Sequence, residues 1–541
     1  MPPTSPDREK SLRELRETTH RVFSGEFSGI TQDSREVRPG YIFAALSGTR
    51  VDGSDFIPQA LKNGATCIIA KTGTKLPEEY KKSPPWNPSP EVRKRLGIEL
   101  FERPPQKKLG ISVSTYRRDS EKPQSKSDMG IMLIEDDNPH LGLSQICAAY
   151  YNKQPQTVVA VTGTNGKTST AHFAAQLWKA LGKKAASMGT LGLVVDGKTR
   201  GASSMTTPDP VTLHRNLADL AQEGVEALCL EASSHGLEQY RLDGVRFAAA
   251  GYTNISRDHL DYHGDMDSYF ASKLRLFSEV LPKGSTAVIN ADVPEAARLI
   301  EACEKAGHNI LSYGRKGKDL EILDLSPEED GLALNLAITG SPVSVMLPLV
   351  GAFQASNVLC AFGLVWAAEG QTDEALIGLL RALPRLEEVP GRMQRIPGPK
   401  AVYVDYAHTP DALRTAIKAL RPHTSGRLHC LFGCGGDRDP GKRPMMGEFA
   451  ARLADRVIVT DDNPRSEDPA AIRSEILEGT KEYDKPIIEI EGRREAIQAA
   501  ISQMEPGDVL LVAGKGHETG QTIGEVTHPF DDAQEVKNAM H

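Results

Sequence analysis

Short hydrophobic runs alternate with longer amphipathic stretches along most of this chain. The clearest run is Thr157–Val161, and it precedes Ser169–Leu181, whose apolar residues recur at helical spacing. Short apolar runs that alternate with amphipathic helical stretches are typical of buried strands joined by helices, and that alternation predicts a mainly parallel sheet. The pattern therefore places the chain in the α/β class.

The first part of the chain shows the same elements on a smaller scale. The apolar runs Tyr41–Leu46, Thr66–Ala70 and Ile131–Ile134 predict strands, and Phe56–Asn63 and Leu141–Tyr151 show helical spacing. Turn signals separate these elements, so we expect a small N-terminal α/β domain.

Residues 71–130 interrupt this pattern. Eight prolines lie between Pro77 and Pro123, among many lysines, arginines and serines. Such a composition buries little apolar surface, so we expect a loop insertion. A basic arm that binds a partner is the alternative.

The last part repeats one pattern, in which a buried strand is followed by a polar loop. The predicted strands are Ala401–Val404, Leu428–Phe432, Arg456–Thr460 and Val509–Val512. In a parallel sheet such loops share one edge, where ligands bind. Arg438, Arg465 and Glu518 lie in these loops. Two guanidinium groups and a carboxylate suit a ligand that carries both carboxylate and ammonium groups, such as an amino acid.

Composition limits the possible classes of protein. A chain of 541 residues exceeds one hydrophobic core, so about three domains are expected. A net charge of −8 argues against nucleic-acid binding, and 39% hydrophobic with 25% charged residues fits a soluble protein. The charged start Met1–Lys10 and the lack of long apolar runs predict neither a secretory signal nor membrane insertion. Seven scattered cysteines predict reduced thiols.

The sequence Thr162–Ser169, which reads T-G-T-N-G-K-T-S, joins the predicted strand and helix. Its backbone N–H groups and the helix N-terminus can bind an anion. Lys167 adds positive charge for a terminal phosphate, and the Thr168 hydroxyl is placed to bind Mg²⁺. The general phosphate-loop pattern has a glycine where Val161 stands here, so a glycine turn without function is the alternative.

Polar residues also follow two other predicted strands of the middle part. Glu231 ends the apolar run Ala227–Leu230, which is where a Mg²⁺ ligand would sit. A dense cluster of ionisable side chains, residues 254–264, is costly unless it binds something. His259 and His263 within it leave a zinc site open, although H-E-x-x-H is not matched.

Seven motifs taken together resemble the Mur ligases. They are T-G-T-N-G-K-T-S-T, T-T-P-D, E-A-S-S-H, R-D-H-L-D-Y-H-G, the A-S-K of Ala271–Lys273, D-Y-A-H-T-P-D and G-D-R-D-P-G-K-R-P. The resemblance covers the chain apart from residues 71–130. It implies three domains: residues 1–156 binding a UDP-linked substrate, 157–391 with a phosphate-loop ATPase-like parallel sheet flanked by helices, and 392–541 with a Rossmann-like fold that binds an amino acid.

The resemblance also implies an activity. Within the family, the closest likeness is to members that add meso-2,6-diaminopimelate to UDP-N-acetylmuramoyl-L-alanyl-D-glutamate through an acyl phosphate, for peptidoglycan synthesis and hence cell-wall biogenesis, cell shape and division. ATP, Mg²⁺ and a carbamylated Lys273 would be required. A cytoplasmic monomer that acts on small molecules is expected. The L-lysine-adding counterpart and a folylpolyglutamate synthase-like ligase are the alternatives.

Roles for individual residues follow from the resemblance. ATP would be bound by Gly163, Thr164, Asn165, Gly166, Lys167, Thr168, Ser169, Asn357, Arg392, Asp405 and His408. The UDP-linked substrate would be bound by Ser34, Thr206, Thr207, Ser233, Gln239 and Arg241. Diaminopimelate would be bound by Arg438, Asp462, Asn463, Pro464, Arg465, Gly514 and Glu518. Mg²⁺ would be bound by Thr168, Glu231 and carbamylated Lys273, and Lys167, Lys273, Glu231 and His259 form the catalytic set.

The segment Asp462–Arg465 predicts which amino acid is used. It reads D-N-P-R, the form that the family links with meso-diaminopimelate, and lysine-adding relatives usually lack the arginine. The Arg465 guanidinium can bind the distal carboxylate of diaminopimelate, whereas it would repel the ammonium of lysine. One departure from the family is Ser54, because many relatives have histidine after the early Asp52-Gly53; this affects contacts near the uridine.

Overall fold

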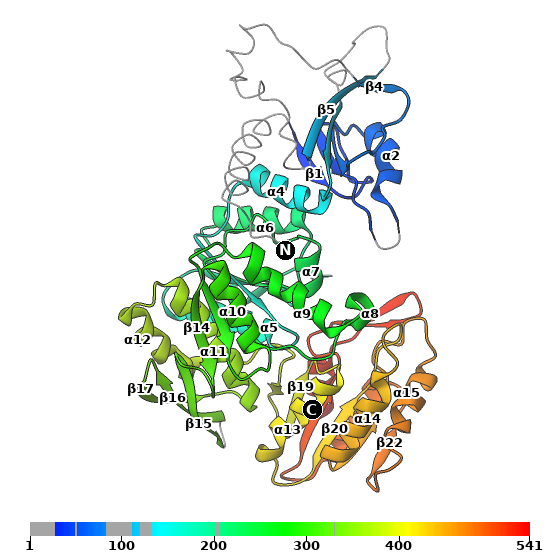
Figure 1. The fold of residues 1–541 in the computed structure, drawn as a ribbon. Helices are drawn as coiled ribbons and strands as arrows, with labels where there is room; N and C mark the ends of the chain where they lie inside the picture. The colour runs from blue at the N-terminus through cyan, green and yellow to red at the C-terminus, as the bar shows by residue number, and fades with distance from the viewer. Residues whose placement is uncertain (1–26, 49–50, 83–110, 119–130, 202–204, 329–330) are drawn as a thin grey trace. The chain divides into compact units, whose positions relative to one another are not determined.

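A computed structural model of the chain describes residues 27–48, 51–82, 111–118, 131–201, 205–328 and 331–541. The described chain forms two compact units (Figure 1). The first contains the residues up to 155 together with 208–224 and 235–245, and the second contains 156–207, 225–234 and 246–541. Each unit is described by itself.

The first unit is built on a six-stranded sheet of order β1-β2-β3-β6-β5-β4. Its strands are β1 (Gly29–Thr31), β2 (Tyr41–Ala44), β3 (Cys67–Lys71), β4 (Tyr80–Lys82), β5 (Ile111–Arg118) and β6 (Ile131–Asp136). Its helices are the 3₁₀ helix η1 (Gly53–Phe56), α2 (Ile57–Lys62), α4 (Pro139–Tyr151) and α6 (Pro210–Gln222). Apolar side chains of α2 and α4 pack on different faces of the sheet, and α6 packs on α4.

The expected loop over residues 71–130 needs correction in its described parts. β4 and β5 are strands there, and β5 pairs antiparallel with β6 while β4 pairs with β5. The alternation of Ile111 and Val113 with serines was a strand signal that the proline-rich composition hid. Backbone hydrogen bonds to a neighbouring strand form regardless of a segment's overall polarity, and this is why the edge strands exist. Residues 83–110 and 119–130 lie outside the described residues.

Asp136, the last residue of β6, makes the stability of the first unit depend on pH. Burial raises the pKa of its carboxyl group to about 6, and Asp137 adds to this, while a hydrogen bond from Asn138 N at 2.8 Å opposes it. A pKa raised in the folded state means that stability is full below the unfolded pKa near 3.8 and falls as pH rises through about 6. The Asp136→Asn variant, whose amide oxygen still accepts from Asn138, should therefore be more stable at neutral pH.

The expected gain for Asp136→Asn is on the order of 1–3 kcal/mol at pH 7.5 and about half of that at pH 5. Thermal unfolding followed at both pH values measures it. Asp137→Asn, next along the chain, serves as the control and should show no comparable gain. A stabilisation by Asp136→Asn that does not change between the two pH values would contradict the titration of Asp136.

The second unit contains an eleven-stranded sheet of order β10-β9-β8-β11-β7-β12-β13-β14-β15-β16-β17. Its strands are β7 (Thr157–Thr162), β8 (Ala185–Gly189), β9 (Gly192–Val195), β10 (Lys198–Arg200), β11 (Ala227–Glu231), β12 (Ala249–Tyr252), β13 (Thr286–Asn290), β14 (Asn309–Gly314), β15 (Leu320–Glu328), β16 (Gly331–Ile338) and β17 (Ser341–Leu347). β8, β11, β7, β12, β13 and β14 are parallel, and β15 to β17 form an antiparallel meander.

The helices associated with this sheet are α5 (Lys167–Ala180), α8 (Leu260–His263), α9 (Met266–Arg275), a π-helix (Leu276–Val280), α10 (Ala296–Ala306), α11 (Ala352–Ala368), α12 (Asp373–Ala382) and the 3₁₀ helix η4 (Leu383–Arg385). The short α7 (Ser234–Glu238) lies where the two units divide the chain. α5 packs on α11, and Phe173, Trp178 and Phe362 join one core cluster between them and the sheet. Most residues of α11 are buried, including Phe362 and Trp366.

A six-stranded sheet of order β18-β19-β23-β20-β21-β22 follows in the second unit. Its strands are β18 (Gln394–Ile396), β19 (Ala401–Asp405), β20 (Leu428–Phe432), β21 (Arg456–Val459), β22 (Ile487–Glu489) and β23 (Val509–Ala513), and β24 (Gly520–Ile523) and β25 (Val526–Pro529) form a separate hairpin. Only β18 is antiparallel to its neighbour in this sheet. The predicted parallel strands are confirmed within a residue.

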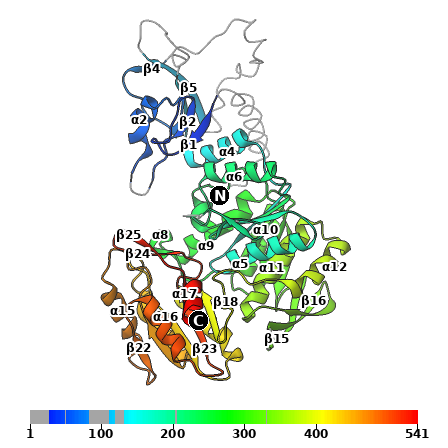
Figure 2. The ribbon, with the colours of Figure 1, turned by 180° about the vertical axis from the view of Figure 1, so that it is seen from behind.

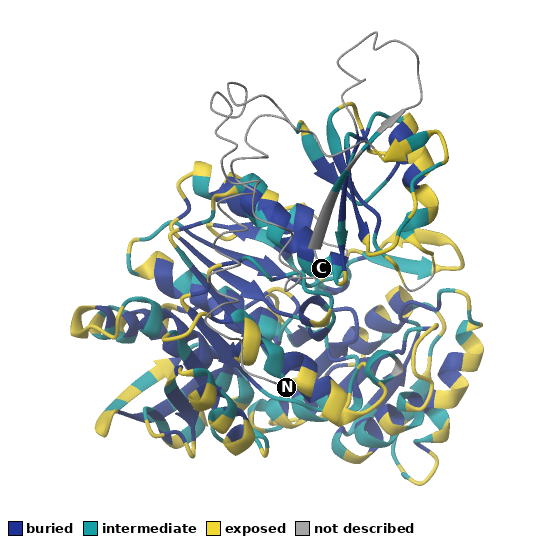
Figure 3. Ribbon diagram, turned by 45° about the horizontal axis from the view of Figure 1, so that its top comes forward, coloured by how far each residue is buried: buried dark blue, intermediate teal, exposed yellow. Residues whose placement is uncertain are grey.

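Helices cover both faces of this sheet. On one face lie α13 (Pro410–Leu420), the 3₁₀ helix η5 (Arg421–His423), α14 (Lys442–Leu453) and α15 (Pro469–Glu478), and on the other lie α16 (Arg493–Ser502) and α17 (Asp532–Met540) (Figures 1 and 2). In Figure 3 the strands are largely dark blue, and exposed yellow residues gather on the outer sides of the helices. The sheet therefore separates two apolar layers.

The carboxyl ends of the parallel strands lie level with one another. Asp405 of β19 and Phe432 of β20 both pair with Ala513 of β23, and Phe432 also pairs with Val459 of β21. The loops that follow these strands consequently start at one edge of the sheet.

Two features bear on the membrane and redox expectations. Within the described ranges, no helix is long and apolar enough to cross a membrane. All seven cysteines lie in described segments, and each is a buried free thiol.

Candidate active site

The predicted order of strand, glycine turn and helix is confirmed at residues 162–169. β7 ends at Thr162, and α5 begins at Lys167 after an N-cap glycine, Gly166, with φ 89°. A Cβ on Gly166 would lie 2.3 Å from Asn357 Oδ1, so no other residue fits that position without displacement. The turn directs the N-terminus of a fourteen-residue helix, with its partial positive charge, into the loop.

Residues after β12 hold the glycine loop in place. Asn254 binds the backbone of Asn165 twice, because its Oδ1 accepts from Asn165 N at 2.9 Å and its Nδ2 donates to Asn165 O at 3.1 Å. The Thr253 hydroxyl donates to the same carbonyl at 2.6 Å. Both residues follow directly from a strand next to β7, so the neighbouring strand sets the shape of the loop.

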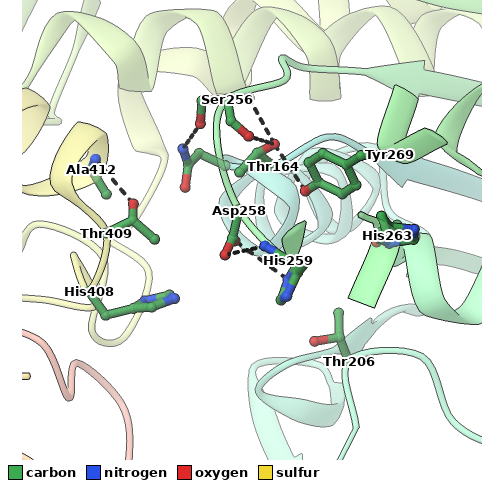
Figure 4. A network of polar contacts seen from close by, with 12 residues as sticks. Thr164, Thr206, Ser256, Asp258, His259, His263, Tyr269, His408, Thr409 and Ala412 are labelled. Atoms are coloured by element: carbon green, nitrogen blue, oxygen red, sulfur yellow. Dashed lines mark hydrogen bonds and ion pairs between the residues drawn. The ribbon is translucent and has the colours of Figure 1, made fainter. Parts of the chain in front are cut away.

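The Thr164 side chain links the loop to two further segments (Figure 4). Its hydroxyl accepts from Ser256 N at 3.0 Å and lies 3.1 Å from the Tyr269 hydroxyl. Tyr269 is buried on α9. The loop is therefore held by the start of the segment 254–264, which was predicted to bind something, and by Tyr269 on the helix that follows it.

The Lys167 ammonium lies over the glycine loop. Its Nζ donates to the carbonyls of Gly163 and Thr164, each at 2.9 Å. Burial lowers the pKa of Lys167, although the carboxylates of Glu231 and Asp258 oppose this shift. The cation is thus placed where the phosphates of a bound nucleotide would need charge compensation.

Glu231 and Thr168 meet at the carboxyl end of the sheet. Glu231 ends β11, is 2% exposed, and its Oε2 accepts from the Thr168 hydroxyl at 3.1 Å. Thr190 donates to the same carboxylate through its backbone N at 2.8 Å and through its hydroxyl at 3.1 Å. The predicted Mg²⁺ ligands Thr168 and Glu231 are therefore in direct contact, and a carboxylate beside a hydroxyl is a donor set that suits Mg²⁺.

Lys273 on α9 reaches the same loop from the other side. Its side chain is 1% exposed, its Nζ donates to Gly163 O at 2.9 Å, and the ammonium lies 4.3 Å from the centre of the Tyr269 ring. Burial lowers the pKa of Lys273 well below its usual value, and the nearby Lys167 charge lowers it further. The Lys273 ammonium consequently loses its proton to give the neutral amine more easily than an exposed lysine does.

Asp258 lies between His259 and His408 (Figure 4). The Asp258 carboxylate is 3.4 Å from His259 Nε2 and accepts from His259 N at 2.9 Å. Burial alone would raise the pKa of Asp258, but His259, His408 and Lys167 together outweigh it and lower the pKa. Burial and the Lys442 charge lower the pKa of His408, whose Nδ1 lies 2.8 Å from Tyr406 O. Asp258, which the sequence reasoning did not select, is the carboxylate that connects these groups.

The two histidines that left a zinc site open bind different partners. His259 contacts Asp258, whereas His263 Nε2 lies 3.0 Å from the Ser234 hydroxyl and its ring lies against Tyr269. The His259 backbone has φ 53°, which is outside the right-handed helical region. Its side chain therefore does not continue the arrangement of the side chains on α8. The i, i+4 spacing in the sequence therefore does not place the two rings on one helical face.

Arg392 and Asp405, which were also predicted to surround the nucleotide, make different kinds of contact. Arg392 Nη2 donates to the Thr168 hydroxyl at 3.3 Å, and its guanidinium lies 4.3 Å from the centre of the Tyr406 ring. Asp405 instead accepts from Met393 N at 2.7 Å and from Ala407 N at 2.8 Å. Burial raises the pKa of Asp405, and Arg392 opposes the shift. Asp405 thus holds the segment that carries Arg392.

The residues predicted to bind the UDP-linked substrate occur in both units. In the second unit, the Thr207 hydroxyl donates to Glu231 O at 2.8 Å and accepts from Ser233 N at 2.9 Å, and the Thr206 hydroxyl lies 3.2 Å from that of Thr190. This trio is therefore continuous with the Glu231 carboxylate. A ligand bound there would lie next to the predicted Mg²⁺ ligands.

The remaining three residues of that set lie in the first unit. Arg241 donates to the Gln239 side chain, with Nη2 2.6 Å from Oε1. Ser34 is 7% exposed, and its carbonyl accepts from Asn63 Nδ2 at 2.8 Å. Ser34 and Arg35 lie in a turn, and Arg35 pairs with Asp33 at 2.6 Å.

Residues predicted to bind diaminopimelate gather at the carboxyl edge of the last sheet. We call Asn463, Arg465, Lys515 and Glu518 the amino-acid cluster. Asn463 Nδ2 donates to Glu518 Oε2 at 2.8 Å, and Lys515 Nζ lies 3.1 Å from Asn463 Oδ1. The loops after β21 and β23 thereby connect through side chains.

Arg465 follows Pro464 with its backbone in the left-handed region, at φ 54°. Its Nη1 donates to Gly436 O at 2.7 Å, which joins its loop to the one that carries Arg438. Arg438 is exposed, and its Nη1 contacts its neighbour Asp437 O at 3.0 Å. Among the described residues, the single contact to Gly436 is the guanidinium's one hydrogen bond, which leaves its fork able to bind a carboxylate.

Gly514 and Asp462 fix the distance between the loops of the amino-acid cluster. Gly514 has φ 116°, its N donates to Asp405 O at 3.0 Å, and a Cβ there would lie 2.4 Å from Asp462 Oδ2. The buried Arg493 donates to Ala513 O at 2.9 Å and pairs with the buried Asp532 at 2.7 Å. The buried Arg493–Asp532 pair therefore holds the end of β23 in place.

Comparison with known proteins covers nearly the whole chain. Three family models match: Mur ligase family, catalytic domain, over residues 26–151; Mur ligase middle domain over 161–365; and Mur ligase, glutamate ligase domain, over 391–516. A protein of Caulobacter vibrioides is 45% identical over 95% of both chains, and one of Rhizobium meliloti is 44% identical over 95% of this chain and 94% of its own. Both are named UDP-N-acetylmuramoyl-L-alanyl-D-glutamate–2,6-diaminopimelate ligase.

This chain belongs to the Mur ligase family. A solved structure with the same ligase name is 36% identical, has a TM-score of 0.60, and the match covers 95% of this chain and 94% of the other. MurF from Acinetobacter baumannii, at 19% identity and TM-score 0.60, covers 97% and 98%, and Mycobacterium tuberculosis folylpolyglutamate synthase, at 20% identity and TM-score 0.59, covers 69% and 91%. These last two show a shared fold. The predicted three-domain α/β architecture is the Mur ligase architecture.

Sequence reasoning missed several residues of this Mur ligase that hold the predicted site residues in place. Asn254 and Thr190 follow strands next to β7 and β11, and Asp258 and Lys515 lie in loops that start where a strand ends. The position after a parallel strand was the signal that could have found them. Several of their partners, such as Asn165 for Asn254 and Asn463 for Lys515, are distant in sequence, so the sequence alone did not give these contacts.

Proposed function

We propose that this Mur ligase is an ATP-dependent enzyme that joins meso-2,6-diaminopimelate to UDP-N-acetylmuramoyl-L-alanyl-D-glutamate during peptidoglycan precursor synthesis. The observation that carries the proposal is the segment Asp462–Arg465, which contributes Arg465 to the amino-acid cluster with N–H groups of its guanidinium left to bind a carboxylate. Relatives that are 41–45% identical over most of the chain carry the corresponding ligase name. The L-lysine-adding reaction is less favourable, because a lysine ammonium would face Arg465.

ATP is proposed to bind at residues 163–169, where the loop and the N-terminus of α5 present N–H groups to phosphate. Thr168, Glu231 and Lys273 would hold Mg²⁺, which supplies positive charge beside the phosphates. The contact between Thr168 and Glu231 at 3.1 Å supports this ligand set. The negative charge of the ATP phosphates also needs a cation from this chain. Lys167 lies at the glycine loop, where its ammonium can supply that charge.

Lys273 is proposed to act as a carbamate. Its lowered pKa favours the neutral amine, which can attack carbon dioxide to form an N–C bond with loss of one proton. The product carries a negative charge, which the neighbouring Lys167 would stabilise. The burial of a lysine without an acidic partner in a hydrogen bond supports this modification, since the amine donates only to Gly163 O among the described residues.

The proposed reaction proceeds in two steps. A carboxylate of the UDP-linked dipeptide attacks the γ-phosphorus of ATP, which forms an acyl phosphate and releases ADP. The amine of diaminopimelate then attacks the acyl carbon, phosphate leaves, and the amine loses its proton. Lys167 balances charge in the first step, and Asp258, held with a lowered pKa, orients His259 beside the loop.

The organisation of the enzyme follows from the same proposal. We assign residues 1–156 to the UDP-linked substrate, 157–391 to ATP and 392–541 to the amino acid. We further propose that the enzyme is a cytoplasmic monomer. Light scattering of the purified protein measures the monomer mass.

A phosphate-release assay tests the function. The purified protein is given ATP, Mg²⁺ and the UDP-muramoyl dipeptide, with meso-diaminopimelate, L-lysine or no amino acid, and a folate substrate with glutamate replaces the dipeptide in a fourth reaction. Release that depends on both the dipeptide and diaminopimelate is expected, with at least about a tenfold preference over lysine. Equal rates with lysine would overturn the selectivity, and release only with the folate substrate would overturn the Mur substrate.

A further inference from the structure

Lys515 is a buried cation that the predicted reaction does not use. It follows β23 in the sequence A-G-K-G-H-E, and its side chain is 0% exposed. Burying an ammonium is costly unless each of its N–H groups is satisfied. Its position at the edge where the amino acid is expected to bind therefore calls for a reason.

Three acceptors surround the Lys515 ammonium. Its Nζ lies 3.1 Å from Asn463 Oδ1, 3.2 Å from Glu518 Oε2 and 2.6 Å from Gly520 O. An ammonium has three N–H donors and no acceptor, so these contacts use its full capacity. The three acceptors come from the loop after β21, the loop after β23 and the start of the β24–β25 hairpin.

Lys515 is one of two donors that fix the direction of the Asn463 amide. Because a lysine cannot accept a hydrogen bond, Asn463 must present its oxygen to Lys515, and the same oxygen accepts from Thr522 N at 2.9 Å. The amide nitrogen then faces Glu518 Oε2, to which it donates at 2.8 Å. Removal of Lys515 would take away one of the two donors to the amide oxygen and leave Thr522 N as the other.

Lys515 also decides which oxygen of Glu518 remains available. Asn463 Nδ2 and Lys515 Nζ both bind Oε2. No hydrogen bond from any described residue reaches Oε1, and the Glu518 side chain is 33% exposed. One carboxylate oxygen is thus held inside the cluster, while the other can accept from the ammonium of an amino acid.

The third acceptor connects Lys515 to Arg465. Gly520 begins β24, and two residues later Thr522 O accepts from Arg465 N at 3.0 Å, while Gly524 N donates to Arg465 O at 2.7 Å. The hairpin therefore holds the Arg465 backbone at both its polar groups, in the left-handed conformation that costs energy for a side chain other than glycine. By fixing the start of the hairpin, Lys515 helps to hold Arg465 in place.

We propose that Lys515 is a positioning residue for the amino-acid substrate, which helps to orient the Asn463 amide, the Glu518 carboxylate and the hairpin that holds the Arg465 backbone. It does not touch the reacting atoms; it acts through those three groups. The inference rests on the proposed function for the identity of the amino acid. A purely structural lysine would affect all substrates alike, whereas a positioning residue of this cluster affects the amino acid selectively.

Replacement of Lys515 by methionine tests the proposal, because methionine is similar in length and has no N–H donor. The KM for diaminopimelate should rise at least about tenfold in Lys515→Met, with the KM values for ATP and for the UDP-linked dipeptide within about twofold of wild type. Lys515→Gln, which keeps two N–H donors without the charge, should show a smaller rise. This second variant also serves if Lys515→Met does not fold.

Lys485→Met is the matched control. Lys485 Nζ donates to the carbonyls of Arg452 at 3.1 Å and Ala454 at 2.7 Å, next to the amino end of β21 and so at the opposite edge of the same sheet. It should leave all three KM values unchanged. A double variant with Glu518→Gln should raise the KM for diaminopimelate by less than the product of the single effects, because both changes act on one network.

The outcomes separate the inference from the function on which it rests. An unchanged KM for diaminopimelate in both Lys515 variants, or an equal rise for all three substrates, would overturn the positioning role while the proposed function stands. If the wild-type enzyme used a different amino acid, the KM for that amino acid would be the quantity to compare. No turnover of the wild-type enzyme with any amino acid would overturn both.

Discussion

Replacement of Lys273 by alanine should lower kcat at least about 100-fold, with a much smaller change in the KM for diaminopimelate. Lys273 lies against Gly163 O at 2.9 Å and beside the charge of Lys167, so its carbamate would be part of the preorganised electrostatics around the phosphates. Removal of one such group commonly costs 100-fold or more in rate, about 3 kcal/mol. Steady-state phosphate release measures kcat and each KM.

Acetate or formate should partly restore the activity of Lys273→Ala, since a small carboxylate can occupy the space of the lost carbamate. Lys283→Ala, an exposed lysine after the π-helix, is the control and should keep wild-type kcat with no response to acetate. Intact-mass analysis of the wild-type protein should also show the added mass of carbon dioxide, which Lys273→Ala would lack. A kcat within about twofold of wild type would contradict the role of Lys273.

Replacement of Arg465 by alanine should lower kcat/KM for diaminopimelate at least about tenfold, mostly through KM. The loss of a charge-assisted bidentate bond to the distal carboxylate is worth about 1.5–3 kcal/mol. Arg465→Lys keeps the charge but not the planar fork, so it should recover only part of the activity. The same variants should use L-lysine no worse than wild type, because the repulsion of its ammonium is reduced or unchanged.

Arg456→Ala is the matched control for Arg465→Ala. Arg456 begins β21, the strand that leads to Arg465, and its side chain contacts Gln503 at the opposite edge of the sheet. It should leave kcat/KM for diaminopimelate unchanged. Equal discrimination between diaminopimelate and lysine by wild type and by Arg465→Ala would refute the selectivity role of Arg465.

Much of the fold could be predicted because hydrophobic runs report strands that are buried on both faces. The predicted strand Leu428–Phe432 and β20 have the same bounds, and the predicted strand Thr157–Val161 differs from β7 by one residue. Such strands carry continuous apolar runs because helices cover both sides of the sheet. β5, which lies between β6 and the edge strand β4, was missed since its composition is polar and its neighbours in the sequence are proline-rich.

The predicted site residues were found by motif, and the structure brings several of them together. Thr168 contacts both Glu231 and Arg392, which lie far apart in the sequence. Spacing in the sequence gave no reason to choose Asp258 or Lys515, because partners such as His408 and Asn463 come from loops after other strands. Asp405 proved to be occupied by backbone N–H groups, so it acts on the nucleotide region through Met393 and Ala407.

The sequence by itself determined the α/β class, the order of strand, glycine loop and helix, and the D-N-P-R segment with its candidate amino acid. These are local or periodic features, which a chain expresses through neighbouring residues. Only the tertiary structure decided that Asn254 shapes the glycine loop, that Thr168 meets Glu231, and that Lys515 orients the amino-acid cluster. The physical reason is that parallel strands bring their carboxyl ends to one edge, so residues from distant loops share hydrogen bonds that no sequence spacing encodes.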